Sequence, residues 1–183
     1  MVTADYRLKA ATFADIETYV RCHVACLAET YVDIMPPAFF EQQRHGIAAR
    51  IAEEQRQWTE VGPATSGTRL HLALDVAGAT VGVARSGPGP QTWEARLGAP
   101  RAAVDLQLHH IYTMRRTHGS GLGQSLLDLA VGEHDAYLWI LHGNTRAERF
   151  YRRNSFVPDG VELDCGPTWF HRSMFRMLRH GTG

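Results

Sequence analysis

The sequence predicts one α/β domain, residues 1–183, with a mixed, mostly antiparallel twisted sheet of about seven strands and about four flanking helices. Two observations carry this prediction. Apolar and polar residues alternate over 70–76, and a turn at Gly78 leads into a further extended segment, which is the pattern of an antiparallel hairpin. Later, an apolar extended run (106–114), a glycine-rich turn and a helical run (122–132) follow one another. That order indicates a strand-helix-strand unit within the sheet.

The N-terminal half is expected to hold a short strand and two helices. Residues 6–10 are extended, and Thr12 with Asp15 forms a capping box that opens a helix. One face of this helix is apolar at helical spacing: Ile16, Val20, Val24 (or His23), Leu27 and Tyr31. A second helix covers 39–58 and is broken near Gly46. We expect its charged surface to lie in solvent: Arg50, Glu53, Glu54 and Arg56.

The second half starts with a long irregular connection. Residues 80–84 complete the hairpin, and 85–103 are rich in glycine and proline, with Trp93 as an apolar residue to pack. Long connections in compact domains are often functional. The remaining elements are a strand at 137–141, a helix at 145–153 and extended segments at 157–163 and 173–178.

Composition excludes several classes of function. Lys plus Arg number 19, as do Asp plus Glu, and no dense basic run occurs, which disfavours a nucleic-acid partner. No apolar stretch is long enough to span a membrane, and residues 1–5 lack the layout of a signal peptide, so we expect a cytoplasmic protein without a membrane partner. Cys22, Cys26 and Cys165 build neither a disulfide framework nor, with the neighbouring His23, a metal site.

Alternate glycines mark the turn before the helical run: Arg116-Thr117-His118-Gly119-Ser120-Gly121-Leu122-Gly123. Such a turn presents bare backbone N–H groups at the positive end of a helix, which is a seat for a phosphate-bearing ligand. A P-loop is excluded because Gly123 is followed by Gln124-Ser125, so the lysine is missing. The dinucleotide fingerprint is excluded because its third glycine must come three residues after the second. Here Gly121 is followed by Leu122-Gly123-Gln124, so that position holds a glutamine.

A second motif follows at residues 144–156. It reads Asn-x-x-Ala-x-x-Phe-Tyr-x-x-x-Ser-Phe, and on a helix its Asn144, Ala147 and Tyr151 share one face, while Phe150 turns to the core. Asn144 also suits the N-cap of this helix, a role that can coexist with ligand binding.

The two motifs, Arg-x-x-Gly-x-Gly and the segment after Asn144, resemble the GCN5-related N-acetyltransferase (GNAT) superfamily. The similarity covers about the C-terminal half, and the N-terminal half matches only in its order of elements. The family motif has a glycine where this chain has Ser155, so Asn154 or Ser155 must make the helix-ending turn. The resemblance implies a sheet that splays between its fourth and fifth strands, and acetyl-CoA as cosubstrate.

The implied activity is transfer of an acetyl group from acetyl-CoA to a primary amine of a small molecule. A peptide or protein N-terminus is the alternative acceptor, and a non-catalytic acyl-CoA sensor is the alternative class. The first two helices and 85–103 are expected to recognise the acceptor. The latter segment is a rim of that site or a subunit contact, which leaves a homodimer open. Glu29 and Asp33 lie either in solvent or against a cationic amine.

The resemblance also assigns the cofactor site and the general acid. The glycine turn would hold the pyrophosphate, and the preceding strand would pair with the pantetheine. The residues expected to bind acetyl-CoA are Tyr112, Thr113, Met114, Arg116, His118, Gly119, Ser120, Gly121, Leu122, Gly123, Gln124, Ser125 and Asn144. Tyr151, with a phenol pKa near 10, is expected to protonate the departing thiolate.

The general base is less defined. Many family members carry a glutamate where this chain has Gln107, which cannot take a proton. His109 and His110 are the next candidates, because a pKa near 6.5 suits the task. Strand alternation sends them to opposite faces, unless a bulge intervenes between Leu108 and Ile111, which are out of phase. A base acting through water would leave no signature.

Overall fold

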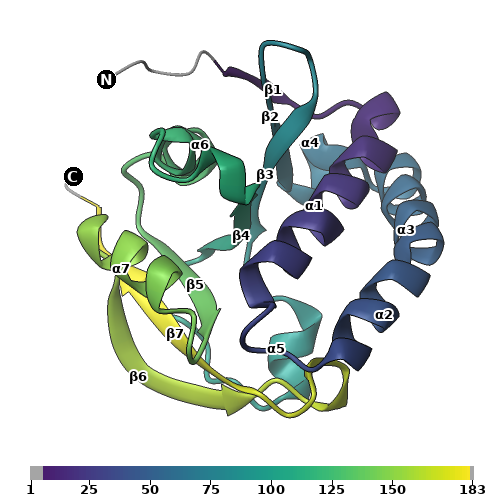
Figure 1. The fold of residues 1–183 in the computed structure, drawn as a ribbon. Helices are drawn as coiled ribbons and strands as arrows, with labels where there is room; N and C mark the ends of the chain where they lie inside the picture. Colours follow the sequence, from purple (N-terminus) through teal and green to yellow (C-terminus); the bar gives the residue numbers. More distant parts are fainter. Residues whose placement is uncertain (1–5, 182–183) are drawn as a thin grey trace.

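The computed structural model describes residues 6–181, so residues 1–5, considered above for a signal peptide, lie outside it. A seven-stranded sheet forms its centre, in the order β1-β2-β3-β4-β5-β7-β6 (Figure 1). The strands are β1 (Arg7–Ala10), β2 (Arg69–Leu74), β3 (Thr80–Pro88), β4 (Leu106–Thr113), β5 (Ala136–Leu141), β6 (Val157–Asp164) and β7 (Ser173–Arg179). Within the described chain β4 and β5 are the one parallel pair. The predicted mixed, mostly antiparallel sheet is confirmed.

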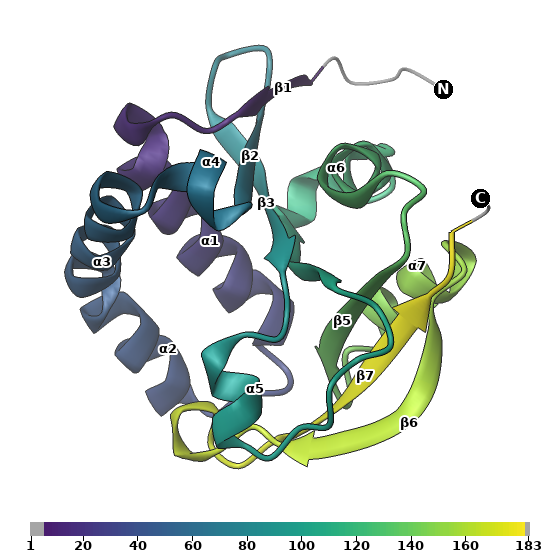
Figure 2. The same cartoon turned by 180° about the vertical axis from the view of Figure 1, so that it is seen from behind.

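Helices cover both faces of this sheet. They are α1 (Ile16–Tyr31), α2 (Pro37–His45), α3 (Ile47–Glu60), α4 (Gly62–Ser66), α5 (Thr92–Arg96), α6 (Leu122–Val131) and α7 (Thr145–Arg153). In Figures 1 and 2, α1 to α3 lie on one side and α6 on the other. The expected break at Gly46 separates α2 from α3. The helix count is higher than expected because of this break and because one-turn helices, α4 and α5, form in segments without a periodic pattern.

The start of α1 follows the local prediction. The backbone N–H and the hydroxyl of Thr12 both donate to the Asp15 carboxylate, at 2.8 and 2.7 Å, which is one half of the predicted capping box. A short 3-10 turn (Phe13–Asp15) leads into the helix. The apolar face predicted for α1 is buried along its length, from Ile16 at 0% exposure to Tyr31 at 5%.

The charged surface predicted for the second helix is only partly in solvent. Glu53 and Arg56 are exposed and pair with each other. Glu54 instead forms an ion pair with Arg85 of β3, and Arg50 donates to Gln43 of α2, and both are half-buried. That expectation was wrong for these two residues, because polar partners on β3 and α2 meet them on the inner side of α3.

Two segments of the sheet also differ from the sequence pattern. Leu70, His71, Leu72 and Ala73 are all buried, although they alternate in polarity, because β2 lies between β1 and β3 with helices on both faces. The connection expected at 85–103 is not wholly irregular, since β3 continues to Pro88 and α5 follows.

A buried carboxylate fastens α5 to the sheet. Glu94 is 1% exposed and accepts hydrogen bonds from the Gln91 backbone N–H (2.8 Å), the Trp139 indole N–H (2.9 Å) and the Tyr137 hydroxyl (3.1 Å). A carboxylate buried in this way needs such donors to offset its lost hydration. The bonds therefore hold α5 against β5.

The predicted bulge and splay both occur in β4. In the β3–β4 register, Arg85 faces His110 and Ser86 faces Leu108, so His109 is the extra residue of a bulge. A single register pair, Gln107 with Tyr137, joins β4 to β5, and the two strands then diverge. Further along, Ser155 takes the left-handed conformation (φ 65°) after α7, while Asn154 does not.

The cysteines are reduced. Cys22 and Cys26 are buried with their sulfurs 3.9 Å apart, and Cys165 is half-buried. Within residues 6–181 no three His, Cys, Asp or Glu side chains gather as a metal site would require. None of the helices described has both the length and the apolar character of a membrane span.

Candidate active site

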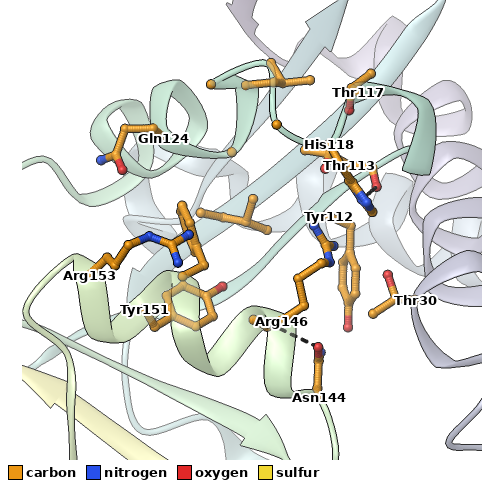
Figure 3. A pocket seen from close by; sticks show the side chains of 17 residues that line it. Thr30, Tyr112, Thr113, Thr117, His118, Gln124, Asn144, Arg146, Tyr151 and Arg153 are labelled. Atoms are coloured by element: carbon orange, nitrogen blue, oxygen red, sulfur yellow. Dashed lines mark hydrogen bonds between the residues drawn. The ribbon is translucent and has the colours of Figure 1, made fainter.

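The wedge between β4 and β5 opens into a cavity of about 290 Å³, which we call the loop cavity (Figure 3). Its walls are the end of β4, the glycine turn before α6, and α7. The predicted ligand-binding residues that line it are Tyr112, Thr113, His118, Gly119, Gly121, Leu122, Gly123, Gln124 and Asn144, and the predicted acid Tyr151 lies among them. Two motifs separated in sequence thus face one space.

The glycine turn leaves backbone donors free. Gly119 and Gly121 are left-handed, with φ of 83° and 88°, and this conformation turns the chain into α6. Among the hydrogen bonds of the described residues, none is donated by the N–H groups of Gly119, Gly121, Gly123 or Gln124. A β-carbon at Gly119 or Gly121 would meet no atom within 4 Å, so the turn is open. Free amides at a helix start form an anion site.

Four predicted residues lie outside the cavity lining: Met114, Arg116, Ser120 and Ser125. Arg116 pairs with Asp75 of the β2–β3 turn at 2.8 Å. The Ser120 hydroxyl donates to the Thr117 carbonyl at 2.7 Å and stabilises the turn from within. These side chains shape or flank the loop rather than face the space it encloses.

Cationic side chains reach the loop cavity from α7 instead. Arg146 and Arg153 line it, and neither has an ion-pair partner within residues 6–181. Burial lowers the pKa of Arg146, which still leaves a guanidinium charged at neutral pH. Sequence reasoning missed both, although Arg146, Phe150 and Arg153 have the spacing of one helix face and Phe150 also lines the cavity. Thr30 and Thr117 line it too, without any local signal.

Two tyrosines line the loop cavity, Tyr112 and Tyr151, and of the two only the Tyr151 hydroxyl has no hydrogen-bond partner among the described residues. Asn144 caps α7, its side-chain oxygen accepting from the Ala147 amide at 3.3 Å, and one face of the helix then presents Tyr151. In Figure 3 the Tyr151 hydroxyl is turned toward the cavity, and no hydrogen bond to another described residue engages it. Burial raises the pKa of Tyr151, so the phenol keeps its proton at neutral pH.

A second cavity of about 610 Å³ adjoins the first, and we call it the aromatic cavity. Five aromatic side chains line it: Tyr31, Trp93, Tyr112, Trp139 and Trp169. They come from α1, α5, β4, β5 and the connection after β6, and Figure 2 shows α5 beside that connection. Tyr112 lines both cavities, and its hydroxyl lies 3.1 Å from that of Tyr31. The two cavities therefore meet at Tyr112.

The bulge in β4 separates the two candidate histidines. His109 lines the aromatic cavity, and its Nε2 is buried without a hydrogen-bond partner in the described chain. Burial lowers the pKa of His109 to about 3, against a smaller opposing effect of the Pro88 backbone. His109 is thus a neutral imidazole whose ring lines the cavity, while its Nε2 is shielded from solvent.

His110 points to a different environment. Its Nε2 lies 2.6 Å from the Tyr19 hydroxyl, and its ring stacks on His23 with 4.2 Å between ring centroids. It lines neither cavity. Burial, and then the neighbouring His23, hold the pKa of His110 well below its usual value. The structure therefore places His110 in a packed cluster, and His109 is the one of the two whose ring lines a cavity.

Comparison with known proteins supports the fold. No protein-family model matches the sequence, and curated protein sequences give no significant match. Solved structures do match. The PaiA N-acetyltransferase of Thermoplasma acidophilum, in complex with coenzyme A, is similar with a TM-score of 0.68 and 15% identity, over 96% of this chain and 99% of that one.

Two further structures match along nearly their whole length. The GNAT superfamily phosphinothricin acetyltransferase of Sinorhizobium meliloti, in complex with AcCoA, has a TM-score of 0.62 and 20% identity, over 100% of this chain and 91% of that one. The spermidine N-acetyltransferase SpeG of Vibrio cholerae has a TM-score of 0.59 and 15% identity, over 94% and 92%. Together with the splayed β4–β5 pair, these matches show that the chain has the fold of the GCN5-related N-acetyltransferases.

Proposed function

We propose that this protein is an acetyltransferase that moves an acetyl group from acetyl-CoA directly to a primary amine of a small molecule. The observation that carries the proposal is the loop cavity, where unengaged backbone amides at the start of α6 face the free hydroxyl of Tyr151. Two structures with the same fold hold coenzyme A or AcCoA, which supports the same ligand class here.

Acetyl-CoA would be held mainly by backbone. The amides of Gly119, Gly121 and Gly123 would donate to the pyrophosphate, with Arg146 adding positive charge. The edge of β4 beyond Gln107 has no β5 residue paired with it, so the pantetheine amides can add to this edge as a further strand would. A β4 amide near Ile111 or Tyr112 would then donate to the thioester carbonyl oxygen.

The chemistry requires two proton transfers. The amine nitrogen attacks the thioester carbonyl carbon, a C–N bond forms and the C–S bond breaks. The sulfur takes a proton from Tyr151, whose phenol stays protonated because burial raises its pKa, and the phenolate regains a proton from solvent. The nitrogen, made acidic by the new C–N bond, loses its proton to water.

His109 is the better supported of the two histidines for contact with the amine. Its ring lines the aromatic cavity, which also includes Tyr112, and its Nε2, shielded from solvent without a ligand, has no hydrogen-bond partner in the described chain. With a pKa lowered to about 3 it stays neutral and can accept a hydrogen bond from an uncharged amine. We therefore assign His109 the role of orienting the attacking nitrogen, and none to His110.

The aromatic cavity distinguishes an enzyme from a sensor. An acyl-CoA sensor needs only the loop cavity, whereas 610 Å³ beside Tyr112 provides space for an acceptor. The test is thermal stabilisation by acetyl-CoA, followed by thiol release with a panel of amines and dipeptides. Stabilisation with thiol release supports the enzyme, and release with dipeptides alone favours a peptide acceptor. Stabilisation without release by any acceptor would indicate a sensor. A cytoplasmic location and a homodimer stay predictions.

A further inference from the structure

We infer that the acceptor is a primary amine on an aromatic body that also carries a carboxylate, as in an aromatic α-amino acid. This inference rests on the proposed function and names the substrate class for the aromatic cavity. Three features of that cavity carry it: its aromatic walls, the absence of an acidic side chain among its described lining residues, and the single cation at Arg96.

The walls suit a planar apolar group. Trp93 and Trp139 meet edge to face, with 5.8 Å between ring centroids, and Tyr31 and Trp169 meet in the same way at 5.9 Å. Aromatic rings prefer such edge-to-face or offset contacts with one another. A ring entering between the two pairs would find both faces and edges to pack against.

The Trp139 ring is held in place before any ligand binds. Its indole N–H donates to Glu94 at 2.9 Å, and Glu94 is itself held by the Tyr137 hydroxyl and the Gln91 amide. The carboxylate is buried and its partners surround it, so it does not line the cavity. Glu94 thus fixes a wall of the cavity and is not available to bind an ammonium group.

The other acidic candidates for a cationic acceptor are also absent from the cavity. Glu29 accepts from the Arg115 amide at 2.5 Å and lines neither cavity, and Asp33 is exposed outside both. The possibility that these two residues bind a cationic amine is therefore not supported. A polycation would enter a space with no compensating carboxylate, which costs free energy.

Arg96 supplies the one charge in the described lining. It is the last residue of α5 and is exposed, and no ion pair with another described residue engages its guanidinium. A guanidinium in this position can bind a carboxylate through two parallel hydrogen bonds. An acceptor whose carboxylate meets Arg96 and whose ring packs against the tryptophans would hold its amine, on the carbon that bears the carboxylate, inside the cavity that Tyr112 and His109 also line.

The test compares four acceptors by thiol release at saturating acetyl-CoA: L-phenylalanine, 2-phenylethylamine, L-alanine and spermidine. We expect kcat/KM to be highest for L-phenylalanine, about 10-fold above 2-phenylethylamine, which lacks the carboxylate, because a hydrogen bond to a charged group is worth about 1.5 kcal/mol or more. L-alanine, which lacks the ring, and spermidine should be poorer still. Higher kcat/KM for spermidine or L-alanine would overturn the inference while leaving the proposed function intact.

A variant separates the carboxylate contact from general damage. Arg96→Gln should abolish the preference for L-phenylalanine over 2-phenylethylamine, whereas Arg44→Gln, an exposed arginine on α2 outside both cavities, should keep it. An unchanged preference in Arg96→Gln would contradict the assignment of Arg96. Calorimetric titration of L-phenylalanine without acetyl-CoA gives a reading independent of turnover. Binding without any thiol release would support the cavity assignment and overturn the proposed function, and neither binding nor release would overturn both.

Discussion

The loop cavity and the aromatic cavity meet at Tyr112 but differ in the groups that line them. The loop cavity offers backbone N–H groups from one turn and two arginines from one helix. The aromatic cavity offers aromatic side chains from five separate elements. Backbone amides recognise a ligand whatever the nearby side chains are, whereas a wall of side chains changes with each substitution. The first cavity therefore suits a cosubstrate shared by many enzymes, and the second suits an acceptor particular to this one.

The largest effect is expected from a charge placed on the loop. Gly121→Glu would put a carboxylate where phosphate should bind, and juxtaposed like charges cost several kcal/mol, about 10³-fold in the Kd for acetyl-CoA. Titration calorimetry on the folded variant measures this. Gly78→Glu is the matched control, because Gly78 is also left-handed (φ 80°) with no atom within 4 Å of a β-carbon, but lies in the β2–β3 turn. Equal acetyl-CoA affinity in the two variants would show that the glycine turn is not part of the acetyl-CoA site.

Loss of the Tyr151 hydroxyl should affect chemistry and not binding. Tyr151→Phe removes the proton donor but keeps the ring that packs in the hydrophobic core beside Phe156, so turnover should fall roughly 10²-fold while the Kd for acetyl-CoA changes little. Steady-state kinetics with a saturating acceptor, together with calorimetry, separate the two quantities. Tyr6→Phe, outside both cavities, serves as the control. Near wild-type turnover in Tyr151→Phe would mean that solvent or another residue protonates the sulfur.

Arg146, which lines the loop cavity, and Arg116, which lies outside its lining, should differ in their effect on acetyl-CoA binding. Arg146→Gln should weaken acetyl-CoA binding about 10-fold at low salt, the effect of losing a charge-assisted contact to phosphate. Arg116→Gln should change it far less, because Arg116 pairs with Asp75 and lies outside the lining. The Kd measured at two ionic strengths tests the pair. The reverse order of effects would show that Arg116 leaves Asp75 when the cosubstrate binds.

Substitutions of His109 and His110 test which of the two histidines contacts the acceptor. His109→Gln should raise KM for the acceptor up to about 10-fold, the worth of one hydrogen bond, with little change in acetyl-CoA affinity. His110→Gln should leave KM unchanged and lower the free energy of unfolding, because it breaks the contacts with Tyr19 and His23. Acceptor titrations and urea unfolding of both variants provide the comparison. A KM effect confined to His110→Gln would show that the acceptor binds on the His110 side of the bulge, which would contradict the role assigned to His109.

Acidification should destabilise the folded protein through two buried histidines, His23 and His109. The pKa values of His23 and His109 fall to about 3 in the folded protein because the rings are buried, against about 6.5 unfolded. The unfolded state then binds more protons between these values, so the free energy of unfolding should decrease as the pH falls below about 6.5, by at most about 1.4 kcal/mol per pH unit for each ring. Above pH 7 these groups contribute no slope.

Urea unfolding at several pH values measures that slope. His109→Gln should reduce it. An unaltered slope in His109→Gln would show that His109 is as easily protonated in the folded protein as in the unfolded chain.

Much of the donor side of the site could be predicted from the sequence. The glycine turn, the start of α6 and the face of α7 that bears Asn144 and Tyr151 depend on residues a few positions apart, so spacing alone places them. The bulge in β4 was also predictable, because Leu108 and Ile111 are out of phase. These features are local, and their conformational preferences are present before the chain folds.

The tertiary structure decided how those local elements meet. Pairing with β3 makes His109 the extra residue of the bulge and gives it, and not His110, to the aromatic cavity. Packing turns Arg146 toward the ligand space and joins Arg116 to Asp75, 41 positions away. The five aromatic walls come together only when α1, α5 and the two halves of the sheet close around Tyr112. Contacts between side chains far apart in the chain leave no periodicity in the sequence, so the aromatic cavity, where we propose that the acceptor binds, became visible only in the folded molecule.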